Sequence, residues 1–318
     1  MRASSKPLKC FLGLLLVTLV SPDVPANTCL ENETSCSPQP WPTPCWDTTP
    51  QNHRMAGHAT RGYVVLLDSW EKLTWATLGL VRLMHMTKAA GLSLVEPCVS
   101  QGGIGGFGDV SKFQLEAYFD THALRIQAGT VTVSEFASVA ERGQGEEWIF
   151  DTLLVFLWWQ EEQRHVRFEP SSGLADCTST LSDILGASVT PLPLHDGNPE
   201  QLYTISKLND GTGNPIWTQH LAFRRILCAD PDSLSRRGSA FDSPGDWLAN
   251  AHGGKGGRVA MARYRRTALT RKGAEEWGRW EEDEEGLKAV RLAPQLQAAL
   301  EDFRDESLGG ERYVGVHL

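Results

Sequence analysis

The sequence predicts an α/β fold, a Rossmann-like open parallel sheet with flanking helices. Residues 63–67 form a continuously apolar run, which is typical of a strand buried on both faces of a parallel sheet. A run with helical periodicity follows, and residues 92–95 form a second short apolar run. The order strand, helix, strand is that of a right-handed crossover unit, so we expect these two strands to be parallel.

Local signals mark the ends of this helix and of the second strand. Asp68 occupies a predicted N-cap position with Glu71 three residues later, the pattern of a capping box. Gly91 follows the last predicted helical turn, where a residue of left-handed conformation commonly ends a helix. Pro97 then closes the second strand, because proline donates no ladder hydrogen bond.

The same periodicities predict the remaining elements. Strands are expected at residues 148–159, 223–229, 259–264 and 313–318. Short helices are expected at 112–121 and 134–141, the second capped by Ser134, and an amphipathic helix at 292–303. Residues 160–214 are rich in Ser, Thr, Pro and Gly and predict long loops. Residues 245–257 predict a linker rather than a phosphate-binding Walker loop, because Gly256 follows Lys255.

The amino terminus has the pattern of a secretory signal. Residues 1–26 place basic side chains ahead of an apolar run at 10–20, which is about half the roughly 20 residues that a spanning helix needs. A short signal anchor is the alternative. We therefore expect the ER or Golgi lumen, or secretion, with a Pro/Ser/Thr-rich stalk at 27–60. The domain proper is expected at 61–318, with insertions at about 160–214 and 232–290.

The cysteines and a sequon fit that compartment. Without Cys10 in the signal segment, six cysteines are left, and an even set suits disulfides. These are Cys29, Cys36, Cys45, Cys98, Cys177 and Cys228. Six cysteines allow about 15 pairings, so the sequence does not fix their connectivity. Asn32 begins an Asn-Glu-Thr sequon and is predicted to carry a glycan.

The net charge of the chain argues against one class of binding partner. The chain has 318 residues and a formal net charge of -9. An acidic chain offers no broad basic surface to displace the counterions of a nucleic acid, so we expect no nucleic-acid partner. No segment after residue 26 is long and apolar enough to cross a bilayer.

Two parts of the sequence resemble glycosyltransferases related to the GDP-fucose O-fucosyltransferases. The first is the opening unit, which carries Trp70, Glu71, Thr74 and Ala76, then Ala90-Gly91-Leu92, then Val95-Glu96-Pro97. The second is the end of the chain, residues 311–318 (ERYVGVHL), which is similar to the strand that ends in His-x-Arg in that family. The arginine itself would be the next residue.

The resemblance implies a fold, an activity and candidate residues. It implies the first half of a GT-B architecture and transfer of fucose from GDP-fucose to a hydroxyl of a protein or glycan, without a metal or another cofactor. His317 is the one residue that maps onto the family's donor-binding motif. Gly103 and Gly105 are further donor-binding candidates, which come from the glycine-rich segment described below and not from the resemblance. Glu71 and Glu96 occupy plausible cleft positions and are the candidate catalytic carboxylates, and capping or structural roles explain both residues equally well. Because the family's second domain supplies most nucleotide contacts, this chain is expected to have little or no transferase activity by itself.

The glycine-rich segment after residue 99 has three interpretations. Gly103, Gly105 and Gly108 match the letters of a dinucleotide fingerprint and follow a predicted strand. The fingerprint also needs an acidic residue about 20 positions later, at the end of a second strand. A flexible loop at the carboxyl edge of the sheet is the first interpretation. A backbone that admits a diphosphate or an acceptor, and a nicotinamide site, are the other two.

Other candidates each have an ordinary structural explanation beside the functional one. The pair Trp158 and Trp159 suits either core packing or stacking on a sugar ring. Asp230-Pro231-Asp232 is either a turn that starts a helix or a metal-diphosphate site. The arginines around 258–266 form either an exposed basic face or a phosphate clamp. His195 and Asp196 are a possible acid/base pair.

The sequence also permits a function without catalysis. A secreted or luminal module that binds a glycan or a protein acceptor needs no donor site, and the same α/β core can carry it. Binding of GDP would favour the enzyme, whereas binding of a glycan without GDP would favour the module.

Overall fold

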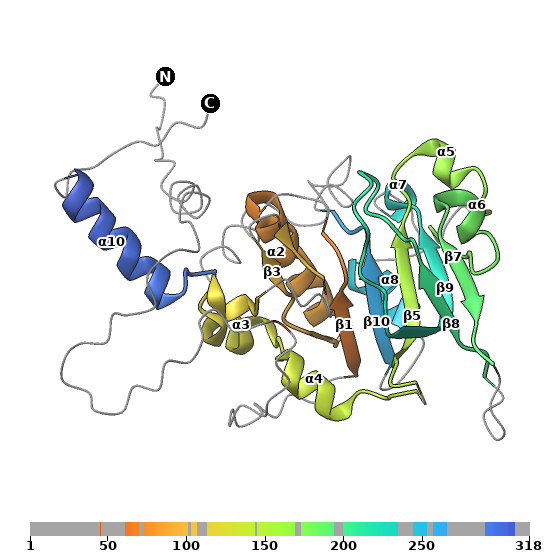
Figure 1. Cartoon of the computed structure of the whole chain (residues 1–318), viewed down its shortest axis with the longest axis horizontal. Helices are drawn as coiled ribbons and strands as arrows, with labels where there is room; N and C mark the ends of the chain where they lie inside the picture. Colours follow the sequence, from red (N-terminus) through yellow and green to blue (C-terminus); the bar gives the residue numbers. More distant parts are fainter. Residues whose placement is uncertain are drawn as a thin grey trace.

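The fold is taken from a computed structural model of the chain (Figure 1). The structure describes residues 45, 61–69, 73–100, 103–106, 113–143, 145–168, 173–193, 200–234, 244–252, 257–265 and 290–308. Its centre is an open, mostly parallel sheet with helices on both faces, as predicted from the sequence.

Five parallel strands form the core of the sheet in the order β2-β1-β10-β5-β9. Their bounds are β1 Gly62–Leu66, β2 Ser93–Leu94, β5 Trp148–Phe156, β9 Leu221–Ala229 and β10 Gly257–Ala262. These strands confirm the predicted apolar runs and the crossover unit at the start of the domain. The last predicted strand, 313–318, lies outside the described residues.

An antiparallel extension completes one side of the sheet. β6 (Leu174–Asp176) pairs with β9, and β7 (Ser188–Pro191) pairs with β8 (Tyr203–Ser206). With the short helices α5 (Gln160–Gln163) and α6 (Leu181–Leu185), these strands replace the long loops predicted for 160–214. The segment is structured because its few apolar side chains, Leu181 and Ile205 among them, are buried against the sheet.

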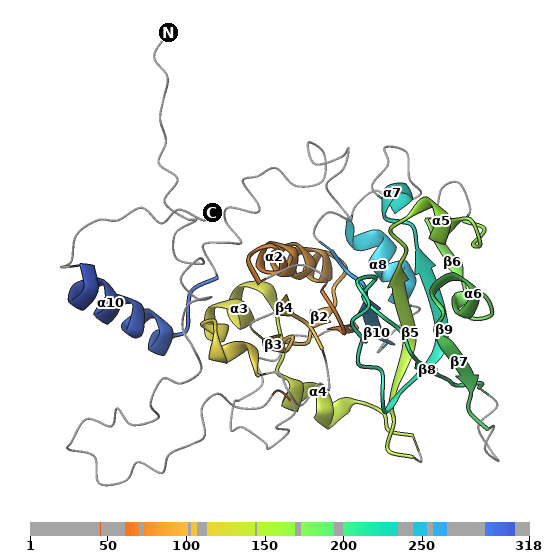
Figure 2. The same cartoon turned by 45° about the horizontal axis from the view of Figure 1, so that its top comes forward.

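Helices cover the sheet in two layers. α2 (Leu73–Ala89) and α8 (Pro244–His252) share one apolar cluster, whereas α4 (Val133–Val139) belongs to the cluster on the opposite face. Figure 2 shows α2 and α4 on opposite sides of the strands. α8 corrects the prediction of a linker at 245–257, since Trp247 and Leu248 are fully buried and fix a helix there.

The ends of α2 agree only in part with the prediction. Gly91 has φ +69°, so it ends the helix in the left-handed conformation as expected. The helix begins at Leu73, however, and Asp68 lies in an isolated bridge with Gly105. Asp68 is therefore not the N-cap, because the pairing with Gly105 continues β1 beyond its last ladder residue.

In the connection between β2 and β5, the helices and their N-caps also differ from those predicted. Residues 115–117 form a single 3-10 turn, and α3 (Thr121–Ala128) follows with Asp120 as its cap, so the helix predicted over 112–121 is wrong. The cap of α4 is Thr132, not Ser134. Thr132 forms a complete capping box with Glu135: the Thr132 hydroxyl accepts from the amide of Glu135, and the Glu135 carboxylate accepts from the amide of Thr132.

The remaining elements lie at the margins of the sheet. β3 (Val99–Ser100) and β4 (Gly103–Ile104) form a two-stranded hairpin, and α7 (Pro231–Leu234) follows β9. The predicted amphipathic helix is α10 (Pro294–Leu308), which extends away from the sheet in both views (Figures 1 and 2). Of its apolar side chains, Leu296 is buried while Phe303 is 46% exposed.

Two disulfides join distant parts of the domain. Cys45 pairs with Cys98, and Cys177 pairs with Cys228. Both fit an oxidising, secreted or luminal environment. Cys29, Cys36 and the sequon at Asn32 lie outside the described residues. Within the described part of the chain, no helix combines the length and apolarity needed to cross a bilayer.

Candidate functional site

The candidate site lies at the carboxyl edge of the parallel strands, where the direction of sheet growth reverses. From β1 the chain crosses to β2 on one side, whereas β10 and β5 lie on the other side. Open α/β sheets bind ligands at such a point, outside the carboxyl ends of the strands. The candidate site therefore lies at the ends of β1, β10 and β5.

The β1–α2 junction forms the first wall of this edge. Ser69 forms a parallel bridge with Tyr264, which extends the β1–β10 pairing past the last ladder residues. The hydroxyl of Tyr264 donates to the carbonyl of Gly79 at 3.1 Å and so ties the end of β10 to α2. The Oγ atom of Ser69 is buried and has no hydrogen-bond partner among the described residues. A buried hydroxyl without a protein partner commonly forms its hydrogen bond with a polar ligand or a water.

Gly105 approaches the same junction more closely than any other residue type would allow. Its φ is +118°, and a Cβ there would lie 2.9 Å from the Cα of Asp68 and 3.0 Å from the backbone nitrogen of Ser69. The amide of Gly105 donates to the carbonyl of Cys98 at 2.7 Å. The Cys45–Cys98 disulfide thus anchors the hairpin that packs on the end of β1.

The end of β10 is held in an unusual backbone conformation. Arg263 has φ +61° and a fully buried side chain. Its guanidinium donates to both carboxylate oxygens of Glu162, at 2.9 and 3.2 Å, and its carbonyl accepts from the indole Nε1 of Trp158 at 2.7 Å. Left-handed backbone at a non-glycine residue is uncommon and is concentrated at functional sites.

Aromatic and cationic side chains gather beside this residue. The Cζ atom of Arg265 lies 4.5 Å from the ring centroid of Trp158 and 5.3 Å from that of Trp159. Trp159 is 39% exposed, whereas Trp158 is partly buried against the core. The two tryptophans therefore differ in environment: Trp158 packs against the core, whereas Trp159 presents its ring to solvent.

The structure places some of the predicted site residues and not others. Gly105, and Gly103 in the same hairpin, lie at the site. Glu71, His317 and the pair His195 and Asp196 lie outside the described residues.

Glu96 follows β2 and is enclosed by structural partners. Its carboxylate oxygens accept from Arg125 at 2.6 and 2.9 Å, and Thr130 donates to one of them at 3.2 Å. Burial raises the pKa of the Glu96 carboxyl, although the hydrogen bond and the charge of Arg125 act in the opposite direction. These contacts tie α3 to the end of β2, and a catalytic role for Glu96 stays a prediction.

The Asp-Pro-Asp sequence after β9 starts a helix, as expected for the turn. The carboxylate of Asp230 accepts from the amide of Asp232 at 3.0 Å and from the side chain of Gln163 at 2.9 Å. Both contacts hold Asp230 at the start of α7. In the described ranges no group of three or more His, Cys, Asp or Glu side chains is arranged to hold a metal ion.

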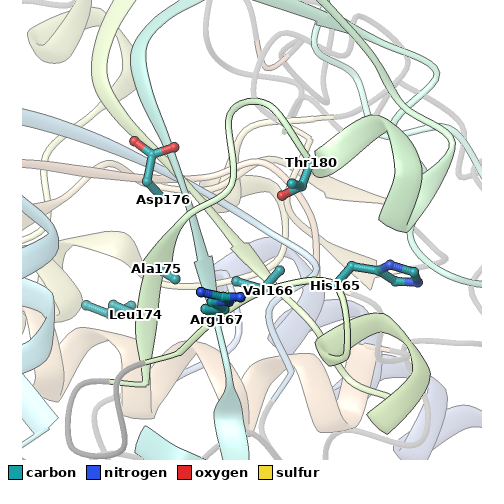
Figure 3. Close-up of a pocket in the computed structure, with 7 residues that line it drawn as sticks. All are labelled: His165, Val166, Arg167, Leu174, Ala175, Asp176 and Thr180. Carbon is teal, nitrogen blue, oxygen red and sulfur yellow. The ribbon is translucent and has the colours of Figure 1, made fainter.

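A separate open pocket of about 650 Å³ lies beyond α5. The turn after α5, the strand β6 and the turn before α6 line it, with His165, Arg167, Asp176 and Thr180 as polar groups (Figure 3). Figure 3 shows these four side chains spread around the pocket rather than directed at one point. This arrangement favours a general surface hollow over a catalytic centre.

Sequence reasoning missed Ser69, Glu162 and Gly211, which complete the candidate site. A Cβ on Gly211 would lie 2.7 Å from Nη2 of Arg263 and 3.2 Å from the ring of Trp159, so the loop after β8 also closes on this edge. Among the residues of this site, Gly103, Gly105, the arginines and the tryptophans carried a signal in the sequence. No protein-family model and no curated protein matches the sequence.

Proposed function

We propose that the chain is the first α/β domain of a glycosyltransferase that transfers fucose from GDP-fucose to a hydroxyl of a protein or glycan, and that this domain contributes part of the donor site. The resemblance of residues 70–97 and 311–318 to the O-fucosyltransferases motivates this choice of reaction. The predicted secretory signal and the two disulfides support the ER or Golgi lumen as the compartment.

The observation that carries the proposal is the bridge between Ser69 and Tyr264 at the switch point of the sheet. It brings the end of the central strand β10 to the junction that leads into α2, a 17-residue helix. The amino-terminal end of such a helix attracts a phosphate through its backbone amides and its dipole. The hydroxyl of Ser69 and the close approach of Gly105 suit a diphosphate lying across this junction.

The transfer step makes two chemical demands on the protein. The acceptor oxygen attacks the anomeric carbon of fucose, the bond from that carbon to the diphosphate oxygen breaks, and GDP leaves with the electron pair. Donors near the diphosphate stabilise the departing charge. A carboxylate must take the acceptor proton, and Asp68, on the same turn as Ser69, joins Glu71 and Glu96 as a candidate.

Calorimetric titration with GDP-fucose and with GDP tests the proposal. The wild-type chain is expected to bind both, and Ser69→Ala is expected to weaken binding about tenfold, the loss of one hydrogen bond to a charged group. Ser182→Ala, an exposed serine on α6, is the matched control and should bind like the wild type. Absence of GDP binding by the folded wild-type chain, or equal affinities of the two variants, would contradict the proposal.

A non-catalytic glycan-binding module is the second candidate, and the exposed ring of Trp159 favours it. An aromatic face beside a cation suits a saccharide whether or not a nucleotide binds nearby. A chain that binds glycans and not GDP in the same titrations would be such a module.

A further inference from the structure

We propose that His252 is a pH-sensitive latch, in which the neutral imidazole holds the carboxyl-terminal end of α8 against the first residues of β1 and β10. Mild acid charges the ring and loosens that end of the helix. The latch consists of His252 with Gly62 and Gly257. It lies at the amino-terminal end of the parallel strands, so the inference is independent of the candidate site and of the proposed function.

The ring of His252 fills a niche between two glycines. His252 is the last residue of α8 and is 5% exposed. Gly62 and Gly257 are the first residues of β1 and β10 and are register partners. A Cβ on Gly62 would collide with Nε2 of the ring and lie 2.8 Å from its Cδ2, and a Cβ on Gly257 would lie 3.0 Å from Nε2. The niche therefore exists because neither position carries a side chain.

A hydrogen bond fixes the protonation state of the ring. The Nε2 atom lies 3.0 Å from the carbonyl oxygen of Gly257. A carbonyl only accepts, so Nε2 carries the proton of the neutral imidazole and Nδ1 carries none. In acid, the second proton therefore binds to Nδ1. Within the described part of the chain, no residue forms a hydrogen bond with Nδ1, so the new N–H gains no protein acceptor there.

Two further side chains hold the same end of α8, and neither changes charge in mild acid. The hydroxyl of Thr152 on β5 donates to the carbonyl of Ala251 at 2.9 Å, and Nη2 of Arg225 on β9 donates to the same oxygen at 2.7 Å. The Nε atom of Arg225 also donates to the Thr152 hydroxyl at 2.8 Å. A hydroxyl does not titrate in this range and a guanidinium stays charged. Of these three side chains, His252 alone responds to pH.

Burial is the main obstacle to charging the ring, and it lowers the pKa of His252 below its ordinary value of 6.5. The carbonyl of Gly257 and the carboxylate of Asp151 on β5 favour the charged form, whereas the charge of Arg225 on β9 opposes it. The fold therefore prefers the neutral imidazole.

The acidic group near the ring is already engaged. Asp151 accepts from Nη1 of Arg224 and from the amide of Arg258 on β10, each at 2.7 Å. The side chain of Arg258 in turn donates to Glu141 at 2.9 Å. Asp246, the other charged residue of α8, is exposed in the first turn. Because Asp151 is shared in this way, it compensates only part of the cost of burying a charged ring.

The lowered pKa fixes the sign of the effect. The stabilisation from neutral His252 is complete above pH 6.5 and is lost as the pH falls from 6.5 towards the lower, folded-state pKa. Histidine switches commonly act at about pH 5 to 6, which lies below this value. The loss that comes from Glu141 begins only below pH 4.5, so the two effects are separable.

Loosening α8 affects one of the two apolar clusters of the domain. Trp247, Leu248 and Ala251 on α8 are fully buried in the cluster that also contains Leu80 and Leu83 of α2. Local opening of a helix exposes its amides to exchange at a lower free energy than global unfolding does. We therefore expect the first loss of protection in acid at α8.

Hydrogen–deuterium exchange of the whole chain at about pH 7.5 and about pH 5.5 tests the latch, with each rate expressed relative to the intrinsic rate at that pH. Protection of residues 244–252 should fall in acid in the wild type. His252→Gln should show the same protection at both pH values, because a neutral amide can donate to Gly257 and does not titrate. His85→Gln, at an exposed histidine on α2, is the matched control and should behave like the wild type.

Histidine NMR of the wild type gives a second measurement that does not depend on a variant. The ring of His252 should titrate below pH 6.5 and should be the Nε2–H tautomer when neutral. Protection of α8 that does not change with pH in the wild type would overturn the inference. A loss of protection that persists in folded His252→Gln, or a ring that titrates at or above pH 6.5, would overturn it as well.

Discussion

The indole Nε1 of Trp158 donates a hydrogen bond of 2.7 Å to the carbonyl oxygen of Arg263. The donor follows β5 and the acceptor follows β10, and these neighbouring parallel strands end at the same edge of the sheet. The bond satisfies a carbonyl in left-handed backbone, and Glu162 accepts from both Nη atoms of the guanidinium of the same residue. One tryptophan and one glutamate therefore hold the backbone on which Tyr264 and Arg265 depend.

Removing the Trp158 donor should destabilise the fold measurably. Trp158→Phe keeps an aromatic ring but leaves the carbonyl of Arg263 without this partner, so we expect a loss of about 1 to 2 kcal/mol in the free energy of unfolding. Urea denaturation measures the loss, and Trp159→Phe, which does not break the bond, is the reference. A Trp158→Phe variant as stable as Trp159→Phe would show that the bond contributes little.

Loss of the Glu162 charge should have a larger effect. Glu162→Gln leaves the buried guanidinium of Arg263 without its counter-charge, and removing one partner of a buried pair costs about 3 kcal/mol. Glu161→Gln, an exposed neighbour on α5, should change stability by less than about 0.5 kcal/mol. Denaturation of both variants under one condition makes the comparison, and equal stabilities would contradict a structural ion pair.

Alanine substitutions at Gly105 and Gly129 distinguish the cost of a left-handed backbone from the cost of steric crowding. A Cβ added to Gly129, at φ +66°, would have nothing within 4 Å, whereas a Cβ added to Gly105 would collide with the backbone of Asp68. We expect Gly129→Ala to cost about 1 kcal/mol, from its left-handed conformation alone. Gly105→Ala should cost about 3 kcal/mol or more and weaken GDP binding, because the junction must move. Similar stabilities and affinities would show that the close approach at Gly105 is not required.

A network at the opposite, amino-terminal end of the strands should contribute a small part of the stability that is lost in acid. Arg224 on β9 and Arg258 on β10 both donate to Glu141, at 3.0 and 2.9 Å. Burial alone would raise the pKa of the Glu141 carboxyl, but the hydrogen bonds and charges of the two arginines outweigh it, so the pKa lies below its ordinary value of 4.5.

A lowered carboxyl pKa fixes the sign of the pH dependence. The stabilisation from Glu141 is complete above pH 4.5 and is lost as the pH falls through the lower, folded-state pKa. Glu141→Gln should therefore be less stable than the wild type at neutral pH, by no more than about 1 kcal/mol because the group is partly exposed. The difference in stability between the variant and the wild type should disappear in acid. Urea midpoints from pH 7 to about pH 3 test this, and a gap independent of pH would contradict it.

The crossover unit and the buried strands were predictable because their signals are local. Continuous apolar runs at β1, β5 and β9 indicate strands covered on both faces, and these strands are buried as expected. The insertion of β10 between β1 and β5 was not predictable, since strand order depends on packing between distant segments. The antiparallel β6 to β8 were missed because their exposed, polar composition is the same as that of loops.

The candidate site was predictable only in its residue types. Trp158, Trp159 and the arginines after β10 stand out by composition, but over 100 positions separate Trp158 from Arg263 in the sequence, and only the sheet brings them together. Glu162 and Ser69 are ordinary surface residue types without their partners. Glu96 is an example of a residue whose sequence position does not decide its role. A carboxylate just after a strand is well placed for catalysis, but the contacts of Glu96 with Arg125 and Thr130 are structural.

Hydrogen–deuterium exchange of the whole chain with and without saturating GDP-fucose tests the central claim most directly. If the carboxyl edge at the switch point binds the donor, amides of residues 66–69, 103–106 and 262–265 should be protected, while those of the antiparallel strands β7 and β8 should exchange as before. Protection confined to the pocket around His165 and Arg167, or no protection by the nucleotide sugar, would contradict the account.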